Sequence, residues 1–351
     1  MVELVLHYSD QHLKPLLNNN EIPLSSLEML GQPLLVRNIS TLTNNIRDID
    51  TIRIPDDKLF SVISILLQKN FPSINVKVNS SNSDASGSSD GSYADYNYKN
   101  KDKDDKSDIK NTSAVENSDI NNSNANTTIS VEDIKKRNAI EIPLNSAVYF
   151  YGDKNIFAID NIIYPWDFLN AVKKILQNEV KQTVISPTAS VSKSSVIEGP
   201  CIIDDGVIID DFSKIKGPTY IGKNSLIGVN SLVRSSMIGK ETRIGFNSEI
   251  AKSYLAGNDK ISHLNLIMDT IIGEKVWFGG YSGTSNTTVT AKNIMYELDN
   301  GKTVDTGTDH FGAVIGNNCT IGTNVVILAG RKVPSNTVIQ AIVKTYQVSS
   351  K

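Results

Sequence analysis

Three features are scarce in this 351-residue chain: cysteine, an excess of positive charge, and long apolar runs. The two cysteines, Cys201 and Cys319, cannot form a framework of several disulfides, and such low usage is typical of a reducing compartment. The formal net charge is −3, so no basic field would attract nucleic acid. No stretch reaches the roughly 18 apolar residues that span a bilayer, and the first residues lack the features of a secretory signal. We therefore expect a cytoplasmic protein that binds neither nucleic acid nor membranes.

A polar, low-complexity segment divides the first half of the chain. Residues 79–130 contain runs such as Ser80-Ser-Asn-Ser-Asp-Ala-Ser-Gly and Asn121-Asn-Ser-Asn-Ala-Asn. They have too few aliphatic side chains to offset the entropy cost of ordering the backbone. The composition predicts a disordered linker between two folded pieces, residues 1–78 and residues 131–182.

The two folded pieces have the patterns of strands and helices. Before the linker, strands are expected at Val2–His7, Thr51–Ile54 and Ile74–Val78, with helices over Pro33–Leu42 and Lys58–Lys69. This alternation predicts a small α/β region with a parallel sheet. After the linker, strands are expected at Val148–Tyr151 and Ile156–Ile159, followed by a helix that starts at Tyr164-Pro-Trp-Asp.

A period of six residues dominates the second half of the chain. Branched aliphatic residues stand at every sixth position from Ile185 to Val233, at Ile238, Ile244 and Ile250 after a one-residue slip, and again from Ile315 to Ile339. Three short strands of this kind make one triangular coil, and coils stack at about 4.8 Å. We expect a mainly β protein, in which a left-handed parallel β-helix over residues 183–345 follows a small α/β region.

A second position of the repeat is always small. Four residues after each aliphatic one stand residues no larger than Val, among them Ala189, Ser195 and Thr242. These side chains are expected to fill a cramped place inside the coil. Cys201 and Cys319 fall at the same position, which predicts small buried hydrophobes rather than catalytic thiols.

The sequence pattern predicts two interruptions of the repeat, at about Leu255–Ile267 and at about Thr284–Ala313. Solenoid proteins often carry function on segments that leave the coil. The first interruption contains His263, and the second contains Asn286 and His310, so functional residues are expected there. The alternative is that these are an ordinary surface His and a turn Asn. His, Cys and Asp do not cluster in the sequence, and we expect no metal site.

A family resemblance rests on the same segments. Ser262-His-Leu-Asn-Leu-Ile-Met-Asp, Val276-Trp-Phe-Gly-Gly, Asn286, Val304-Asp-Thr-Gly and Gly312-Ala-Val-Ile-Gly follow one another in the chain. Together they resemble the acetyltransferase half of bifunctional sugar-1-phosphate nucleotidyltransferase/acetyltransferases, above all the archaeal branch. The resemblance covers residues 140–345 and includes Tyr164-Pro-Trp-Asp, which is similar to the helix that ends the family's nucleotidyltransferase domain.

This resemblance implies an acetyl-CoA-dependent acyltransferase that works as a homotrimer on an amino sugar phosphate or a nucleotide-sugar precursor. It implies that His263 is the general base on the amino group, that Asn286 lies beside the reacting groups, and that Lys252 binds the sugar phosphate. It also implies that a coenzyme channel is lined by Gly280, Thr323 and Ala341.

Two positions depart from the family pattern. Leu266 stands where the family has a Tyr, and Trp277 stands where it has an Asn, and both family residues touch the sugar or the reacting centre. These departures favour an alternative function, a non-catalytic scaffold or regulatory paralogue of a sugar-1-phosphate nucleotidyltransferase. The retained His263 and Asn286 favour the acyltransferase.

The N-terminal region departs further. Gly31-Gln-Pro-Leu-Leu-Val-Arg-Asn-Ile is similar to a segment of nucleotidyltransferases. His7-Tyr-Ser-Asp-Gln-His-Leu-Lys-Pro, however, stands where a Gly-rich phosphate loop should follow the first strand, and without glycines the backbone cannot approach a triphosphate closely. We expect a reduced, degenerate nucleotidyltransferase-like domain that has lost this activity; an active nucleotidyltransferase is the third alternative.

Overall fold

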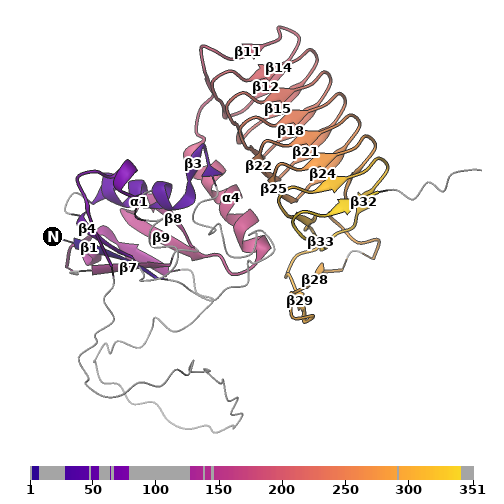
Figure 1. Ribbon diagram of the computed structural model, residues 1–351. Coiled ribbons are helices and arrows are strands. Elements are labelled where there is room, and N and C mark those ends of the chain that lie inside the picture. The colour runs from indigo at the N-terminus through magenta and orange to yellow at the C-terminus, as the bar shows by residue number, and fades with distance from the viewer. Residues whose placement is uncertain are drawn as a thin grey trace, which may run out of the picture.

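The computed structural model describes residues 2–7, 28–46, 49–54, 64, 67–78, 127–136, 139–143, 146–290 and 292–340. Over these residues the protein is mainly β, as predicted. An α/β region and a long stack of strands lie side by side, and helix α4 (Pro165–Glu179) lies between them (Figure 1).

A four-stranded parallel sheet forms the centre of the α/β region. Its order is β5 (Asn75–Val78), β4 (Ile49–Ile54), β1 (Val2–His7) and β7 (Ala139–Pro143). The first three are the predicted strands, and α1 (Leu34–Asn45) is the first predicted helix. The second predicted helix, over Lys58–Lys69, lies largely outside the described residues. Because β7 follows the predicted linker and pairs with β1, which precedes it, segments on both sides of the linker form one sheet.

A second, antiparallel sheet packs on α1. It consists of β6 (Thr127–Ser130), β9 (Ile156–Asn161) and β8 (Ser146–Tyr151), and α3 (Val131–Lys136) follows β6. Strand β6 occupies the last four residues of the predicted linker, because it finds a pairing partner in β9; residues 79–126 lie outside the described part of the chain. Asn38 joins α1 to β8, since its Nδ2 donates to Ser146 O at 2.8 Å and its Oδ1 accepts from Val148 N at 3.1 Å.

The predicted parallel β-helix is confirmed, and its three sheets run the length of the stack (Figure 1). The first sheet contains β10 (Val184–Ile185), β13 (Cys201–Ile203), β16 (Thr219–Ile221), β19 (Met237–Ile238), β22 (Tyr254–Gly257), β25 (Ile271–Glu274), β30 (Val314–Ile315) and β33 (Lys332–Val333). The second contains β11 (Ser190–Val191), β14 (Ile208–Ile209), β17 (Leu226–Ile227), β20 (Arg243–Ile244), β23 (Lys260–Ile261), β26 (Trp277–Phe278), β31 (Thr320–Ile321) and β34 (Val338–Ile339). The third contains β12 (Val196–Glu198), β15 (Lys214–Lys216), β18 (Leu232–Arg234), β21 (Glu249–Ala251), β24 (Leu266–Met268), β27 (Gly283–Thr284) and β32 (Val326–Ile327).

The inside of the coil follows the two-position repeat. Aliphatic residues such as Ile221 and Ile244 are fully buried along the axis, and the small residues lie beside them. Cys201 and Cys319 are both buried in this core. Burial raises the pKa of Cys201 to about 11, which keeps the thiol protonated and unreactive near neutral pH. The prediction of buried structural cysteines is therefore confirmed.

The interruption predicted at about Leu255–Ile267 does not exist. Leu255, Ile261 and Ile267 are buried in the core, and their strands β22, β23 and β24 pair with the coils on both sides. The six-residue spacing is not visible in the sequence here because three successive coils are each one residue shorter than the others. Cys201 pairs with Thr219, which is 18 residues further along the chain. Tyr220, in contrast, pairs with Met237, which is only 17 residues further along.

The shorter coils lose their residue at one corner, between the third and the first sheet. A single residue with positive φ makes each of these tight turns: Ser235 at 48°, Lys252 at 50° and Asp269 at 47°. The aliphatic side chains therefore stay in register while their spacing in the sequence falls from six to five.

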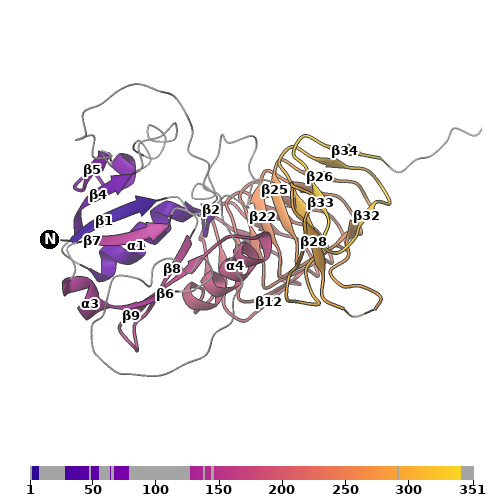
Figure 2. The ribbon, with the colours of Figure 1, turned by 90° about the horizontal axis from the view of Figure 1, so that it is seen from below.

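The second interruption is a real insertion. The chain leaves the coil after Thr284 and re-enters at Val314, and between them β28 (Met295–Glu297) and β29 (Thr303–Asp305) form an antiparallel hairpin. Helix α4 lies beside the outer face of the first sheet, where Phe168 meets Tyr254 edge to face at 4.9 Å, and it also contacts the hairpin (Figure 2). None of the described helices is long and apolar enough to cross a membrane.

Candidate functional site

One corner of the coil carries three of the residues singled out in the sequence. We call the turns between the second and third sheets the second corner; residues 262–265, 279–282 and 322–325 are three successive turns of it. His263, Gly280 and Thr323 occupy equivalent places on these turns. The stacking is direct, because Tyr281 N donates to His263 O and Asn324 N donates to Gly280 O, both at 3.1 Å. Ala341 lies outside the described residues.

Lys252 and Asn286 lie on a different corner. Both belong to the turns between the third and first sheets, and the width of the third sheet separates this corner from that of His263 within one chain. The Asn286 side chain is engaged in the fold, since its Nδ2 donates to Asp269 Oδ2 at 2.6 Å and its backbone O accepts from Phe311 N at 2.9 Å. These contacts close the base of the insertion. The exposed side chain of Lys252 stands two coils earlier on the same corner.

The imidazole of His263 is held against the preceding coil. Its Nδ1 accepts a hydrogen bond from the backbone N–H of Phe246 at 3.0 Å, while the residue as a whole remains exposed. Gly245 makes room for the ring, because a side chain there would place its Cβ 2.9 Å from His263 Nδ1. The ring therefore rests on the backbone of Gly245 and Phe246, with Nε2 on the side away from that bond.

A column of buried polar side chains supports the second corner from inside. Asn265 is its centre: its Nδ2 donates to His263 O at 3.3 Å, and its Oδ1 accepts from Ser282 N at 2.9 Å. Ser248 Oγ accepts from Asn265 N at 3.2 Å, and Ser282 Oγ donates to Gly322 O at 2.7 Å. The sequence reasoning missed Asn265. It occupies the small position of the repeat, and the six-to-five change in spacing hid that position.

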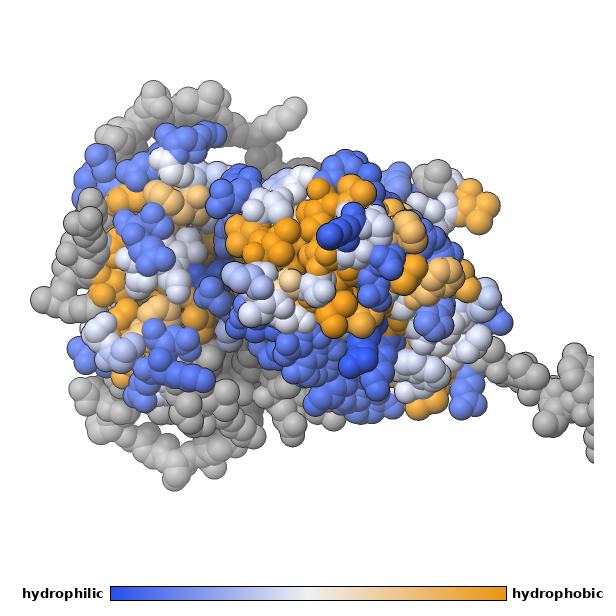
Figure 3. All heavy atoms as spheres, turned by 90° about the horizontal axis from the view of Figure 1, so that it is seen from above, coloured by the Kyte–Doolittle hydropathy of each residue, from blue (hydrophilic) through white to orange (hydrophobic). Residues whose placement is uncertain are grey.

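Exposed apolar side chains surround His263. Phe246 lies one coil before it, Tyr281 one coil after it, and Leu266 follows in the same coil. Trp277 lies on the next coil, where its Nε1 donates to Ser262 Oγ at 3.1 Å. Seen from above, apolar residues gather over the β-helix (Figure 3). Leu266 and Trp277, the two departures from the family pattern, thus add apolar surface around His263.

The insertion carries the other notable histidine. His310 Nδ1 lies 2.8 Å from Asp309 Oδ1, and both side chains are about half exposed. The pKa of Asp309 is lowered by the hydrogen bond and charge of His310. An ionised carboxylate only accepts hydrogen bonds, so His310 Nδ1 donates in this contact.

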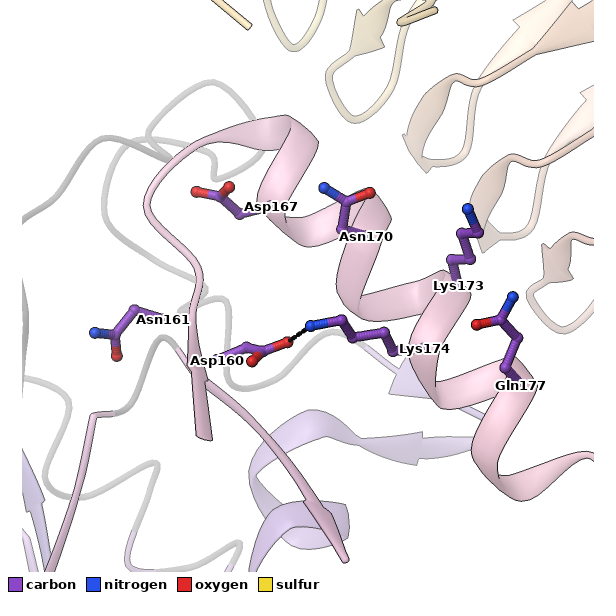
Figure 4. Close-up of a pocket in the computed structure, with 7 residues that line it drawn as sticks. All are labelled: Asp160, Asn161, Asp167, Asn170, Lys173, Lys174 and Gln177. Carbon is purple, nitrogen blue, oxygen red and sulfur yellow. Dashed lines mark hydrogen bonds and ion pairs between the residues drawn. The ribbon is translucent and has the colours of Figure 1, made fainter. Parts of the chain in front are cut away.

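A polar cavity lies elsewhere, between α4 and the end of β9. It measures about 270 Å³ and is lined by Asp160, Asn161, Asp167, Asn170, Lys173, Lys174 and Gln177 (Figure 4). The Lys174 ammonium and the Asp160 carboxylate pair across it at 2.5 Å. Burial raises the pKa of Asp167, although the amides of Tyr164 and Ile163 donate to its carboxylate. Over the described residues, no three His, Cys, Asp or Glu side chains come together in a way that could hold a metal ion.

Comparisons with known proteins concentrate on the β-helix. The model of the "hexapeptide repeat of succinyl-transferase" matches residues 218–235 and 304–341. The bifunctional protein GlmU of Methanococcus aeolicus is 33% identical over 178 residues, which are 50% of this chain and 42% of that protein. The bifunctional sugar-1-phosphate nucleotidylyltransferase/acetyltransferase of Sulfurisphaera tokodaii is 26% identical over 181 residues, which are 48% and 41% of the two chains. The match thus spans less than half the length of these relatives.

Among solved structures, a variant of perosamine N-acetyltransferase from Caulobacter crescentus, in complex with CoA and GDP-perosamine, is 11% identical. The match covers 49% of this chain and 62% of that one, with a TM-score of 0.26. The predicted resemblance is therefore confirmed by sequence: the C-terminal half of this chain is homologous to archaeal bifunctional sugar-1-phosphate nucleotidyltransferase/acetyltransferases and carries hexapeptide repeats.

Proposed function

We propose that the C-terminal half is an acetyl-CoA-dependent acyltransferase that acts on the amino group of a sugar phosphate or nucleotide-sugar precursor. The observation that carries this proposal is the column of His263, Gly280 and Thr323 on one corner, in the segment homologous to the bifunctional enzymes. A histidine beside a stack of exposed turns offers one reacting group and an extended backbone surface for a long, thin co-substrate.

The other predicted residues receive roles that fit their contacts. Gly280 has no side chain and Thr323 has a small exposed one, so both leave the corner open to the coenzyme, and we place Ala341 in the same channel. Lys252 has an exposed ammonium suited to a phosphate. The side-chain amide of Asn286 donates a hydrogen bond to Asp269, so we assign Asn286 a positioning role at the base of the insertion.

We further propose that the protein works as a homotrimer with its sites between copies. His263 and Lys252 lie on different corners of one chain, so a second copy is needed to complete a site from both corners. The exposed apolar residues of the second corner support self-association. Phe212, Phe246 and Tyr281 are 69%, 46% and 64% exposed, and a monomer rarely leaves such a row open to water.

A non-catalytic scaffold is the second candidate. It is favoured by Leu266 and Trp277, which put apolar side chains where the resembling family has polar ones. An apolar corner suits a protein partner as well as it suits a substrate. The N-terminal region, in our proposal, has no nucleotidyltransferase activity, because residues 8–30 contain no glycine that could form a phosphate loop.

The test is turnover of acetyl-CoA by the full chain with glucosamine 1-phosphate or galactosamine 1-phosphate, comparing wild type with His263→Ala. We expect release of free CoA with at least one sugar and a loss of about 10²-fold or more in the variant. Lys260→Ala is the matched surface control and should leave the rate unchanged. Absence of both turnover and coenzyme binding in the wild type would favour the scaffold instead.

A further inference from the structure

We infer that the acceptor of the proposed acyl transfer is a 6-deoxy amino sugar, whose methyl group and ring face lie against Leu266 and Trp277. This inference rests on the proposed acyltransferase function and narrows its acceptor from amino sugars in general to those with an apolar C6 group. It starts from the two side chains that flank His263 on either side of the second corner, and it leaves the role expected for His263 unchanged.

The indole of Trp277 forms one flank. Trp277 lies on β26 of the second sheet, is 42% exposed, and donates from Nε1 to Ser262 Oγ at 3.1 Å. Because Ser262 directly precedes His263, this bond brings the indole across to the coil that carries His263. An indole has one N–H donor and no other polar group. Since that N–H is used within the fold, the exposed part of Trp277 offers a ligand only a hydrocarbon surface.

Leu266 forms the other flank. It stands three residues after His263, on the outer face of β24 in the third sheet, and is 45% exposed. Its strand partner in the next coil is Gly283, where a Cβ would lie 2.2 Å from Leu266 O. The following outward residue is Val326, which is 61% exposed. The gap over Gly283 therefore has an aliphatic side chain on each side, and one side of Leu266 is left uncovered by its own sheet.

These surroundings discriminate between a methyl and a hydroxymethyl group. A hydroxyl group against Leu266 loses its hydrogen bonds to water and gains none from hydrocarbon, whereas a methyl group gains by leaving water. In a hexosamine the C6 group projects from the side of the ring opposite a C2 amine. A sugar with its amine at His263 can therefore direct C6 toward Leu266 while one ring face covers the indole of Trp277. A second copy would add further contacts, but both side chains belong to the wall that the chain carrying His263 itself supplies.

The first test compares two acceptors that differ in one hydroxyl group. The full chain is assayed for turnover of acetyl-CoA with glucosamine 1-phosphate and with its 6-deoxy counterpart, in which a methyl group replaces the hydroxymethyl group. We expect kcat/KM to be about tenfold or more higher for the 6-deoxy sugar, which is the size of effect that an apolar contact gives for one such group. Equal values, or a preference for glucosamine 1-phosphate, would overturn the inference.

Two variants assign this preference to its residues. Leu266→Tyr places a hydroxyl group beside C6 and should lower the ratio of the two kcat/KM values to about one or below. Trp277→Ala should raise KM for both sugars and keep the ratio above one. Ile208→Asn is the matched control, because Ile208 is 43% exposed on the same sheet as Trp277, four strands away, and it should change neither value. If Leu266→Tyr and Trp277→Ala dissociate an oligomer in sedimentation and leave the ratio unchanged, these residues hold copies together and the inference fails.

A binding measurement separates failure of the inference from failure of the proposed function. A wild-type protein that turns over neither sugar contradicts the acyltransferase proposal itself. Calorimetric titration of the full chain with the same two sugar phosphates, in the presence of CoA, then still gives their two Kd values. Binding of the 6-deoxy sugar that is about tenfold tighter, and no longer so in Leu266→Tyr, would support the apolar acceptor site. Equal Kd values, or no binding of either sugar, would refute it.

Discussion

Asp259 is the most unusual single residue of the coil interior. It occupies the position of the repeat that elsewhere holds small residues such as Ser, Thr or Cys, is fully buried, and accepts from Val276 N at 2.8 Å and Gly257 N at 3.2 Å. Burial raises its pKa well above the usual range, despite these two amide donors. The fold therefore favours the protonated carboxyl, and ionising it costs stability.

The sign of the pH dependence follows. An aspartate in the unfolded chain titrates near pH 3.9, so between this value and the raised pKa the folded state binds more protons than the unfolded state. The free energy of unfolding should fall as pH rises from about 4 toward neutrality, by about 1.4 kcal/mol for each unit of raised pKa. In Asp259→Asn this dependence should disappear, which urea unfolding at several pH values will measure.

Asp205 provides the control for this experiment. It is exposed, and hydrogen bonds from Ser186 and Lys223 lower its pKa. Its contribution to stability is present above pH 4 and is lost on acidification, so Asp205→Asn should change the pH dependence in the opposite sense. Equal pH profiles for wild type and Asp259→Asn would contradict the assignment.

Each strand of the coil presents neighbouring residues to opposite environments. In β14, Ile209 is 1% exposed and points into the coil, while Ile208 is 43% exposed on the outer face. The two-residue alternation of a strand makes this difference inevitable once the coil closes. The aliphatic column is therefore the main source of stability for this element.

The pair Ile209→Ala and Ile208→Ala tests this on one strand. The buried substitution removes three carbon atoms from a packed core and should lower the free energy of unfolding by about 2–5 kcal/mol. The exposed substitution should cost less than about 1 kcal/mol. Chemical denaturation of both variants gives the two values, and similar costs at both positions would mean that the strand faces are assigned wrongly.

The whole molecule is held together around α4. Trp166 on this helix meets Tyr296 of the hairpin at 5.7 Å and Phe311 at 6.0 Å, both edge to face. A second contact comes from the small hairpin of β2 (Glu28–Met29) and β3 (Gln32–Pro33), which reaches the coil. There Lys240 Nζ donates a hydrogen bond to Glu28 Oε1 at 2.7 Å. The α/β region thus contacts the middle of the β-helix rather than its first coil.

Trp166→Ala should loosen the insertion without unfolding the coil. Removing the indole leaves a gap between α4 and the hairpin, with a cost of about 3 kcal/mol to that contact. Amides of β28 and β29 should exchange with deuterium about 100-fold faster, as that free energy implies, while amides of β13 to β17 keep their rates. Uniform acceleration along the coil, or none in the hairpin, would argue against α4 as the support of the insertion.

The sequence alone determined the coil, its inward aliphatic column and the burial of both cysteines, because these depend on a local alternation that every strand repeats. It also determined the parallel sheet of the N-terminal region. The tertiary structure decided which residues share a corner, since that depends on the number of residues in every preceding coil, and it placed Lys252 and Asn286 on a different corner from His263. It also decided the engagement of Asn286 with Asp269 and the contact of the His263 ring with Phe246, because both depend on a partner from a neighbouring coil, 17 residues away in the chain.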